Sequence, residues 1–184
     1  MPSLVRAELA YVPSLIEAMR EGYSRDNLRP TTAGEIAQVE REPEWFVRQV
    51  NHPPRQVVLP DGTLGQRVPA TDLWYVDGST FLGSVGIRHE LNDILESWGG
   101  HIGYAVRPSA RRQGHASAML AQALDFVRAN LPLKRVLLTV SNANQGSIRV
   151  IEKNGGVFEA EVDNPWVEGD RGRRYWIDLF PATP

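Results

Sequence analysis

The sequence of 184 residues contains no cysteine. Disulfide bonds, thiolate metal sites and a cysteine nucleophile are therefore excluded. The sequence also lacks any apolar run approaching the ~20 residues of a membrane-spanning helix, so we expect no membrane partner. The first residues, MPSLVRAELA, lack the apolar core of a signal peptide, and we therefore expect a cytoplasmic location.

The sequence also lacks a large excess of either sign of charge. The 20 Lys and Arg residues and the 22 Asp and Glu residues leave a formal net charge of −2. Because nonspecific binding to nucleic acid depends on many Lys and Arg contacts to phosphates, we expect no nucleic-acid partner. The four His residues have neither metal-ligand spacing nor Cys or paired carboxylate partners, so we predict no metal site.

Length and composition are typical of one globular domain. With 42% hydrophobic and 23% charged residues, we expect residues 1–184 to form a single domain. The sequence leaves the oligomeric state open, and a homodimer is one of the alternatives.

Apolar periodicity predicts alternating strands and helices. Strands are expected at 3–9, 73–77, 80–88, 101–106, 136–140, 157–162 and 174–179. Helices are expected at 13–23, 32–50, 116–131 and 144–154. Pro43 interrupts the second of these helices, and Thr32 and Glu35 have the spacing of a capping box at its start. The segments 51–71 and 89–100 are predicted to be loops.

A basic turn, RPSARRQGHASAML at 107–120, lies between a predicted strand and a predicted helix. Strand 101–106, helix 116–131 and strand 136–140 form a crossover, so we expect the two strands to be parallel. Open α/β sheets bind ligands beyond the carboxyl ends of such strands. The position of the turn therefore favours a ligand site.

The residues of this turn suit a pyrophosphate. A helix start has unpaired N–H groups and a positive dipole end. Gly114 has no Cβ to block a phosphate, Ala116 and Ser117 are small, and Arg111 and Arg112 add positive charge. The alternative is a helix-capping loop with solvated Arg side chains, and the loop alone leaves both interpretations open.

Two motifs in these elements resemble a known family. The pattern R-x-x-G-x-A at 111–116 resembles the acetyl-CoA signature of the GNAT N-acetyltransferase superfamily. The patterns N-x-x-S at 144–147 and K-N-G-G at 153–156 are similar to that family's second CoA-binding motif. The stretches RHELN, GGHIGYAVRPS, IEKNGG and RRYWI resemble a poorly characterised group of predicted acetyltransferases, and the resemblance covers nearly the whole chain.

The resemblance implies an α/β fold, with a mixed, mostly antiparallel sheet of about seven strands, a parallel splayed central pair and about four flanking helices. It implies acetyl transfer from acetyl-CoA to a small-molecule or peptide amine, by direct attack in a ternary complex. The residues that it implies for acetyl-CoA binding are Tyr104, Ala105, Val106, Arg111, Arg112, Gln113, Gly114, His115, Ala116, Ser117, Asn144 and Ser147.

The chain departs from the family at the position of the general acid. Many members carry a Tyr seven residues after the motif Asn, and this chain has Ile151 there. Expelling a thiolate of pKa near 8.5 at pH 7 costs roughly 2 kcal/mol, whereas freeing the lone pair of an amine of pKa near 10.4 costs about 4.6 kcal/mol. A general base is therefore the more important group to find.

The candidates for proton transfer are His101 and Glu90 as bases and Tyr175 as a replacement acid. Each has a structural alternative, because His and Glu are common in polar loops and a strand Tyr is often a packing residue. Trp98 is a candidate for lining an acceptor pocket, and Arg173 and Arg174 for attracting an acidic acceptor.

Two other functions remain open. The missing Tyr keeps a non-catalytic acyl-CoA sensor or interaction domain as an alternative. A nucleotide-binding α/β domain is the other.

Overall fold

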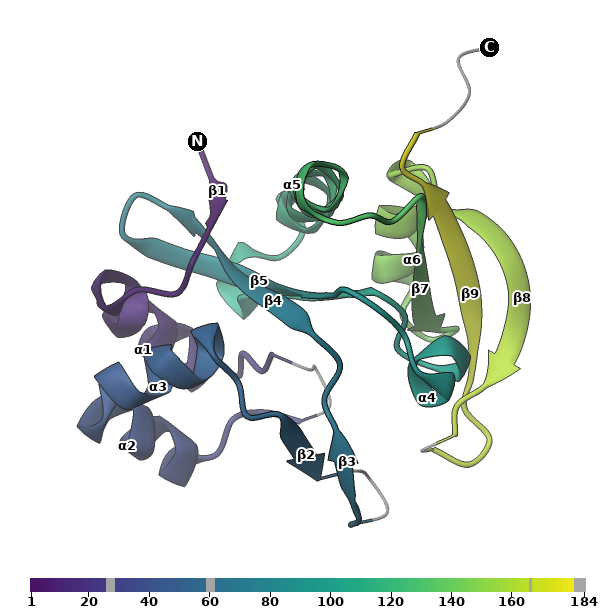
Figure 1. Ribbon diagram of the computed structural model, residues 1–184. Coiled ribbons are helices and arrows are strands. Elements are labelled where there is room, and N and C mark those ends of the chain that lie inside the picture. Colours follow the sequence, from purple (N-terminus) through teal and green to yellow (C-terminus); the bar gives the residue numbers. More distant parts are fainter. Residues whose placement is uncertain (26–28, 59–61, 166, 181–184) are drawn as a thin grey trace.

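The computed structural model describes residues 1–25, 29–58, 62–165 and 167–180. Two antiparallel sheets stand beside each other, with strand orders β1-β4-β5-β6 and β7-β9-β8 (Figure 1). The first contains β1 (Ser3–Val5), β4 (Ala70–Asp77), β5 (Thr80–Arg88) and β6 (Ile102–Val106). The second contains β7 (Arg135–Ser141), β8 (Val157–Asp163) and β9 (Arg171–Asp178).

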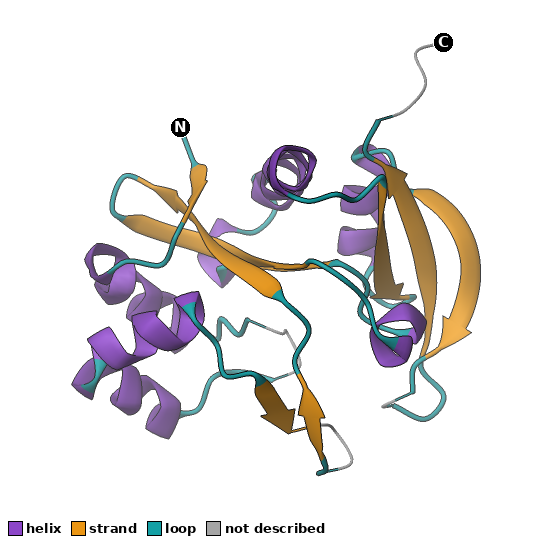
Figure 2. Cartoon of the chain, in the orientation of Figure 1, coloured by secondary structure: helices purple, strands orange, loops and turns teal. Residues whose placement is uncertain are grey.

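Helices cover both faces of the first sheet (Figure 2). On one side lie α1 (Val12–Arg20), α2 (Ala33–Arg41) and α3 (Pro43–Asn51), after a 3-10 turn at Leu9–Tyr11. On the other side lies α5 (His115–Asn130), which follows a 3-10 turn at Pro108–Ala110. The helix α6 (Gln145–Lys153) packs against β7 and α5.

The central strand β4 is buried on both faces, and its side chains alternate between two cores. Leu73 and Tyr75 belong to the cluster that α5 covers, whereas Trp74 and Val76 belong to the cluster under α1–α3. This alternation follows from the two-residue repeat of a strand. Burial on both faces explains why the strand has a continuous apolar sequence.

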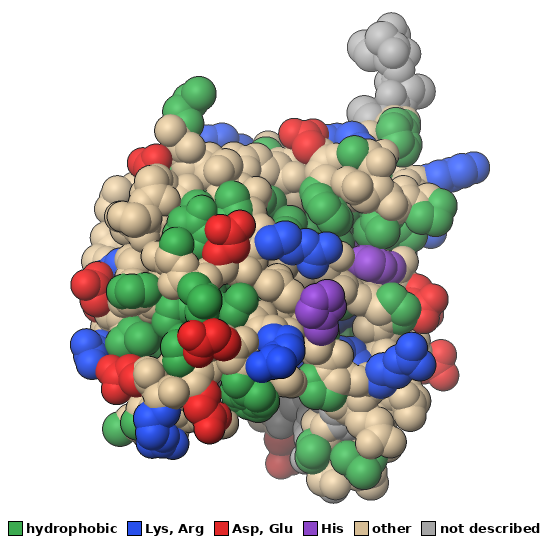
Figure 3. All heavy atoms as spheres, turned by 60° about the vertical axis from the view of Figure 1, so that its left-hand side comes forward, with side chains coloured by type: hydrophobic (Ala, Val, Ile, Leu, Met, Phe, Trp, Pro, Cys, Tyr) green, Lys and Arg blue, Asp and Glu red, His purple; other side chains and the backbone are tan. Residues whose placement is uncertain are grey.

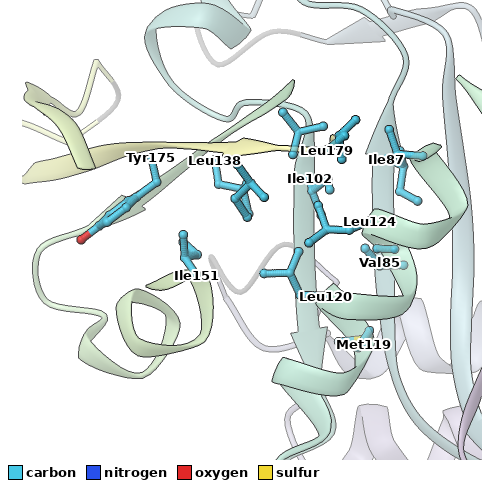
Figure 4. Close-up of a cluster of buried hydrophobic side chains, with 14 of the residues drawn as sticks. Val85, Ile87, Ile102, Met119, Leu120, Leu124, Leu138, Ile151, Tyr175 and Leu179 are labelled. Carbon is cyan, nitrogen blue, oxygen red and sulfur yellow. The ribbon is translucent and has the colours of Figure 1, made fainter. Parts of the chain in front are cut away.

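The larger core joins the two sheets (Figure 4). The α5 side chains Met119, Leu120 and Leu124 pack with residues of the first sheet and with Leu138 and Tyr175 of the second. The helical spacing of the apolar residues in 116–131 predicted this helix, and the burial of its apolar stripe, which is Met119, Leu120, Ala123, Leu124 and Val127, is confirmed. This core holds the sheets together although they do not form one continuous ladder.

Most predicted elements are confirmed, including the capping box at Thr32 and Glu35. Three predictions were wrong. The first strand ends at Val5, because the 3-10 turn before α1 begins at Leu9. The segment 51–71 contains a hairpin of β2 (Gln56–Val58) and β3 (Leu64–Gln66). The segment 89–100 contains α4 (Asp93–Ser97), whose five residues are too few to show a periodicity.

The fold class is confirmed, but the helices and the central pair differ from expectation. The described residues contain α1 to α6 rather than about four helices. The predicted parallel pairing of β6 and β7 is not present among the described residues. The two strands belong to separate sheets and meet there at one isolated bridge of antiparallel type, between Gly100 and Leu138. The N–H of His101 donates to the carbonyl of Leu137 at 2.7 Å beside this bridge. The pair is thus joined at the start of β6 and has no ladder beyond it.

The junction requires glycine at position 100. Its φ is +63°, and a Cβ there would lie 2.3 Å from the carbonyl oxygen of Leu137. We therefore expect Gly100→Ala to lower the free energy of unfolding by about 1–3 kcal/mol in urea denaturation. The control is Gly34→Ala in α2, where a Cβ meets nothing within 4 Å. It should raise stability by about 0.5–1 kcal/mol, and equal effects of the two variants would contradict the assignment.

Candidate functional site

A cavity of about 730 Å³ lies where β6, the basic turn and the starts of α5 and α6 meet. Its lining residues are Tyr104, Ala105, Val106, Ala110, Arg111, Arg112, Gly114, His115, Ala116, Ser117, Asn144, Gly146, Ser147, Arg149, Val150 and Lys153. Every residue predicted to bind acetyl-CoA is among them except Gln113, whose amide donates to the carbonyl of Ser109. Residues from three separate segments are thus brought to one cavity.

The strand β6 turns one backbone edge toward this cavity. Arg107 N–H donates to Leu82 at 2.8 Å, and Arg88 N–H donates to the carbonyl of His101 at 2.7 Å. Because the backbone groups of an antiparallel strand alternate in direction, those of Tyr104 and Val106 point away from β5. β6 is the edge strand of its sheet, so an extended ligand can lie along this side.

The basic turn supplies a helix start without a capping side chain. Gly114 occupies the N-cap position of α5 with φ +86°, which an L side chain rarely adopts. The first intrahelical bond runs from Ala118 N–H to the carbonyl of Gly114. The preceding N–H groups, from His115 to Ser117, therefore have no intrahelical acceptor. They line the cavity, where a helix start favours an anion.

The sequence reasoning missed part of the positive charge in this cavity. Arg149 and Lys153 of α6 line it together with the predicted Arg111 and Arg112. Arg149 and Lys153 are four residues apart and therefore share a helix face. The four-residue spacing of Arg149 and Lys153 in the helix that Asn144 caps is the sequence pattern that could have predicted them as cavity residues.

Two side chains connect β6 to α6 across the cavity wall. The hydroxyl groups of Tyr104 and Ser147 are 2.7 Å apart. Burial raises the pKa of Tyr104 to about 12, so this phenol is protonated at neutral pH. Asn144 caps α6, because its Oδ1 accepts from the N–H of Ser147 at 3.0 Å. Asn144 thus caps α6 and also lines the cavity.

The predicted base His101 lies in the junction between the sheets. Its side chain is 6% exposed, and its Nδ1 accepts from the N–H of Leu137 at 2.9 Å. Burial, together with the charge of Arg88, lowers the pKa of His101 to about 4. The residue is not in the cavity lining, and an imidazole of such low pKa is a weak base. In the structure, the His101 side chain therefore forms a hydrogen bond that joins the start of β6 to β7.

The other catalytic candidates also lie outside the cavity lining. Glu90 is exposed in the turn after β5. Tyr175 is 1% exposed, and its hydroxyl donates to Glu152 at 3.1 Å. The structure therefore does not bring His101, Glu90 and Tyr175 to the predicted cofactor residues.

Trp98 and Arg174 make contacts within the C-terminal sheet. A Cβ at Gly172 of β9 would lie 2.6 Å from the Trp98 ring, so this Trp packs closely on that strand. Arg174 binds Glu159 at 2.7 Å and donates to the carbonyl of Glu96. These contacts give Trp98 and Arg174 structural roles that require no acceptor substrate.

A second pocket, of about 410 Å³, lies on the opposite face of the first sheet, among α1, α2 and α3. Its lining mixes aromatic and apolar side chains with Arg25, Arg29, Glu35 and Arg67. The face seen in Figure 3 likewise shows both signs of charge without one large patch.

The described residues contain no group of three or more His, Cys, Asp or Glu residues suited to holding a metal ion. Among the helices in the described part of the chain, none has the length and apolar character needed to cross a membrane.

Comparisons with known proteins identify the family and the fold. Residues 27–157, more than half of the chain, match the family model of the acetyltransferase (GNAT) domain. A comparison with curated proteins found no match.

Solved structures share the fold at low sequence identity. Mutant forms of the spermidine/spermine N-acetyltransferase SpeG from Vibrio cholerae match with a TM-score of 0.61 and 18% identity, over 97% of this chain and 95% of that one. An N-acetyltransferase from Staphylococcus aureus Mu50 matches with a TM-score of 0.59 and 16% identity, over 98% and 99%. The Salmonella typhimurium protein yncA, solved with acetyl-CoA, matches with a TM-score of 0.57 and 13% identity, over 100% and 97%.

The buried His101 predicts a pH dependence of stability. Its pKa is about 4 in the folded chain and about 6.5 when unfolded. Between these values the unfolded chain binds the extra proton, so stability falls as the pH drops from 6.5 to 4, by up to about 1.4 kcal/mol per pH unit for this group. Denaturation at several pH values should show this slope. His101→Gln should flatten it and exposed His52→Gln should not, and the same slope in all three proteins would contradict the prediction.

Proposed function

Because the chain belongs to the GNAT acetyltransferase family, we propose that it transfers an acetyl group from acetyl-CoA to the nitrogen of an amine, with both substrates bound together. The observation that carries the proposal is the 730 Å³ cavity, which joins the edge of β6, the start of α5 and the first turn of α6. A cavity of this shape and charge suits a long, flexible ligand with phosphates at one end.

The residues of the cavity fit acetyl-CoA by their chemistry. The N–H groups from His115 to Ser117 and the side chains of Arg111 and Arg112 suit the pyrophosphate. Lys153 adds positive charge for the remaining phosphate. The outward backbone groups of Tyr104 and the outward N–H of Val106 suit the amides of the pantetheine arm, in the manner of a strand added to a sheet edge. The carbonyl of Val106 accepts from Nε of Arg111 at 3.2 Å.

Acetyl-CoA supplies an activated thioester in this scheme. The acceptor ammonium first loses one proton to water, and the lone pair of the amine attacks the thioester carbonyl carbon, so that an N–C bond forms while the C–S bond breaks. The nitrogen then gives up its second proton, which leaves a neutral amide. The leaving thiolate takes up a proton. No cysteine is present to carry the acetyl group as a thioester, and direct attack is therefore the simpler route.

The hydroxyl groups of Tyr104 and Ser147 are our proposed proton donors to the thiolate. They are 2.7 Å apart in the cavity wall. Because the pKa of Tyr104 is raised to about 12, its phenol is protonated at neutral pH and can donate a proton to the thiolate. Ile151 is 1% exposed in the core and offers no such group. His101, Glu90 and Tyr175 lie outside the cavity, and the proposal gives them no part in the transfer.

A non-catalytic acyl-CoA sensor is the alternative that Ile151 favours, because the family's Tyr is replaced by a core residue. The sensor would bind acetyl-CoA in the same cavity and release no acetylated amine. Sustained turnover on any amine rules it out.

The phosphate assignment predicts the effect of Gly114→Glu. The variant places a negative charge at the start of α5 and a side chain at φ +86°, so CoA binding measured by calorimetry should weaken at least about 100-fold. The control is Gly169→Glu, which has a similar φ of +78° in a turn outside the cavity lining. It should bind CoA like the parent protein, and unchanged binding by Gly114→Glu would overturn the assignment.

The donor assignment predicts the effect of Tyr104→Phe. Loss of the hydroxyl should lower kcat about 100-fold with little change in CoA affinity, because the ring and backbone remain. Tyr175→Phe loses its bond to Glu152 outside the cavity and serves as the comparison. Steady-state kinetics on one accepted amine measures both, and a larger loss in Tyr175→Phe would reverse the assignment.

A further inference from the structure

Four charged side chains converge on the face of the first sheet that α1, α2 and α3 cover. Asp72 of β4 is 5% exposed and forms an ion pair with Arg25, which follows α1. Arg88 of β5 donates to the carbonyl of Gly100 at 2.8 Å. Arg67, which precedes β4, lines the 410 Å³ pocket together with Arg25.

Some polar atoms of this cluster have no partner in the described chain. The Nε of Arg67 and the Oδ2 of Asp72 are buried and make no hydrogen bond among the described residues. Asp72 lines a small cavity of about 40 Å³ that shares Tyr23, Arg25 and Phe46 with the larger pocket. Buried polar atoms without partners are costly, so this cluster favours a polar ligand.

The cluster carries excess positive charge. The other two charged residues of the pocket, Arg29 and Glu35, bind each other at 2.7 and 2.9 Å and cancel. Among the residues that the structure describes, Arg25, Arg67 and Arg88 then stand against the one carboxylate of Asp72. Burial and the charge of Arg25 lower the pKa of Arg88, Arg67 adds to this effect, and Asp72 opposes it. The guanidinium groups are thus close enough to repel each other, and an added carboxylate would relieve that repulsion.

A row of directly paired residues connects this cluster to β6. Asp72, Gly86 and Gly103 are directly paired across three strands. Directly paired residues point to the same face, and the row spans about 10 Å. A Cβ at Gly86 would lie 3.0 Å from Oδ1 of Asp72, whereas one at Gly103 would meet nothing within 4 Å. The Asp72 and Arg25 side chains thus lie over Gly86, whereas Gly103 is open, so a small molecule that contacts this ion pair can lie over Gly103 beside β6.

We propose that the acceptor is a small amine that also carries a carboxylate, as an amino acid does. Arg67 and Arg25 hold the carboxylate, Asp72 positions Arg25, and the amine points over Gly103 toward β6. This inference rests on the proposed function. The proposal disfavours a polyamine acceptor, because the second ammonium group of a polyamine would be repelled by the same surplus of guanidinium charge.

The test uses matched probes that differ by one carboxylate. L-Phenylalanine is paired with phenethylamine and L-lysine with cadaverine, and spermidine is added. Calorimetry on the CoA-saturated protein should give at least about tenfold tighter binding for each acid than for its partner amine. Equal or tighter binding of the amines or of spermidine overturns the proposal, and so does the absence of binding by both acids.

Two variants locate the effect. Arg67→Gln should weaken the binding of L-phenylalanine relative to that of phenethylamine at least about tenfold, so that the preference for the acid is lost. The control Arg41→Gln, at the exposed end of α2, should keep the preference. A preference that survives in Arg67→Gln overturns the assignment of this residue.

A separate assay distinguishes failure of this inference from failure of the proposed function. Mass spectrometry of the reaction with acetyl-CoA measures acetylated product for every probe. Tight binding of the acids without any product retains the carboxylate site and overturns acetyl transfer. Acetylated spermidine without acid binding retains acetyl transfer and overturns the carboxylate site.

Discussion

The backbone junction between β6 and β7 is the contact on which the rest of the structure depends. His101 and Leu137 exchange hydrogen bonds there, and Gly100 forms a bridge with Leu138. Because the two strands are tied at one end of β6, the remainder of β6 turns an edge toward a cavity instead of a neighbouring strand. The core under α5 keeps the sheets together while this opening persists. Packing that stabilises the fold thus also creates the site.

Local motifs made the residues around the start of α5, the proposed cofactor side of the site, predictable. The residues from Arg111 to Ser117 are consecutive, and a turn that starts a helix needs few distant partners to take its shape. The cavity lining around Gly114 accordingly contains nearly all of the predicted residues. The fold class was predictable for a similar reason, because the α5 stripe and the apolar run of β7 each have a clear period or length.

Contacts between distant residues were not predictable in the same way. The bond that fixes His101 joins residues 36 apart, and the one between Tyr104 and Ser147 joins residues 43 apart. From the sequence alone, a histidine at the start of a strand is a candidate base. The sequence does not reveal whether its side chain faces a cavity or, like His101, a backbone N–H group. The short elements in 51–71 and 89–100 were missed because three to five residues carry no measurable periodicity.

The orientation of α6 links the core to the proposed chemistry. Ile148 and Ile151 are buried together, and this pair fixes which face of the helix meets the core. Figure 4 shows Ile151 among the buried side chains of that core. A hydroxyl at position 151 would lie among Leu138 and other apolar side chains, where an unpaired polar group is costly. The first turn of α6, with Ser147, faces the cavity instead. A proton donor contributed by this helix must therefore come from the cavity-facing positions, and the nearby hydroxyl of Tyr104 on β6 supplies the second half of the pair.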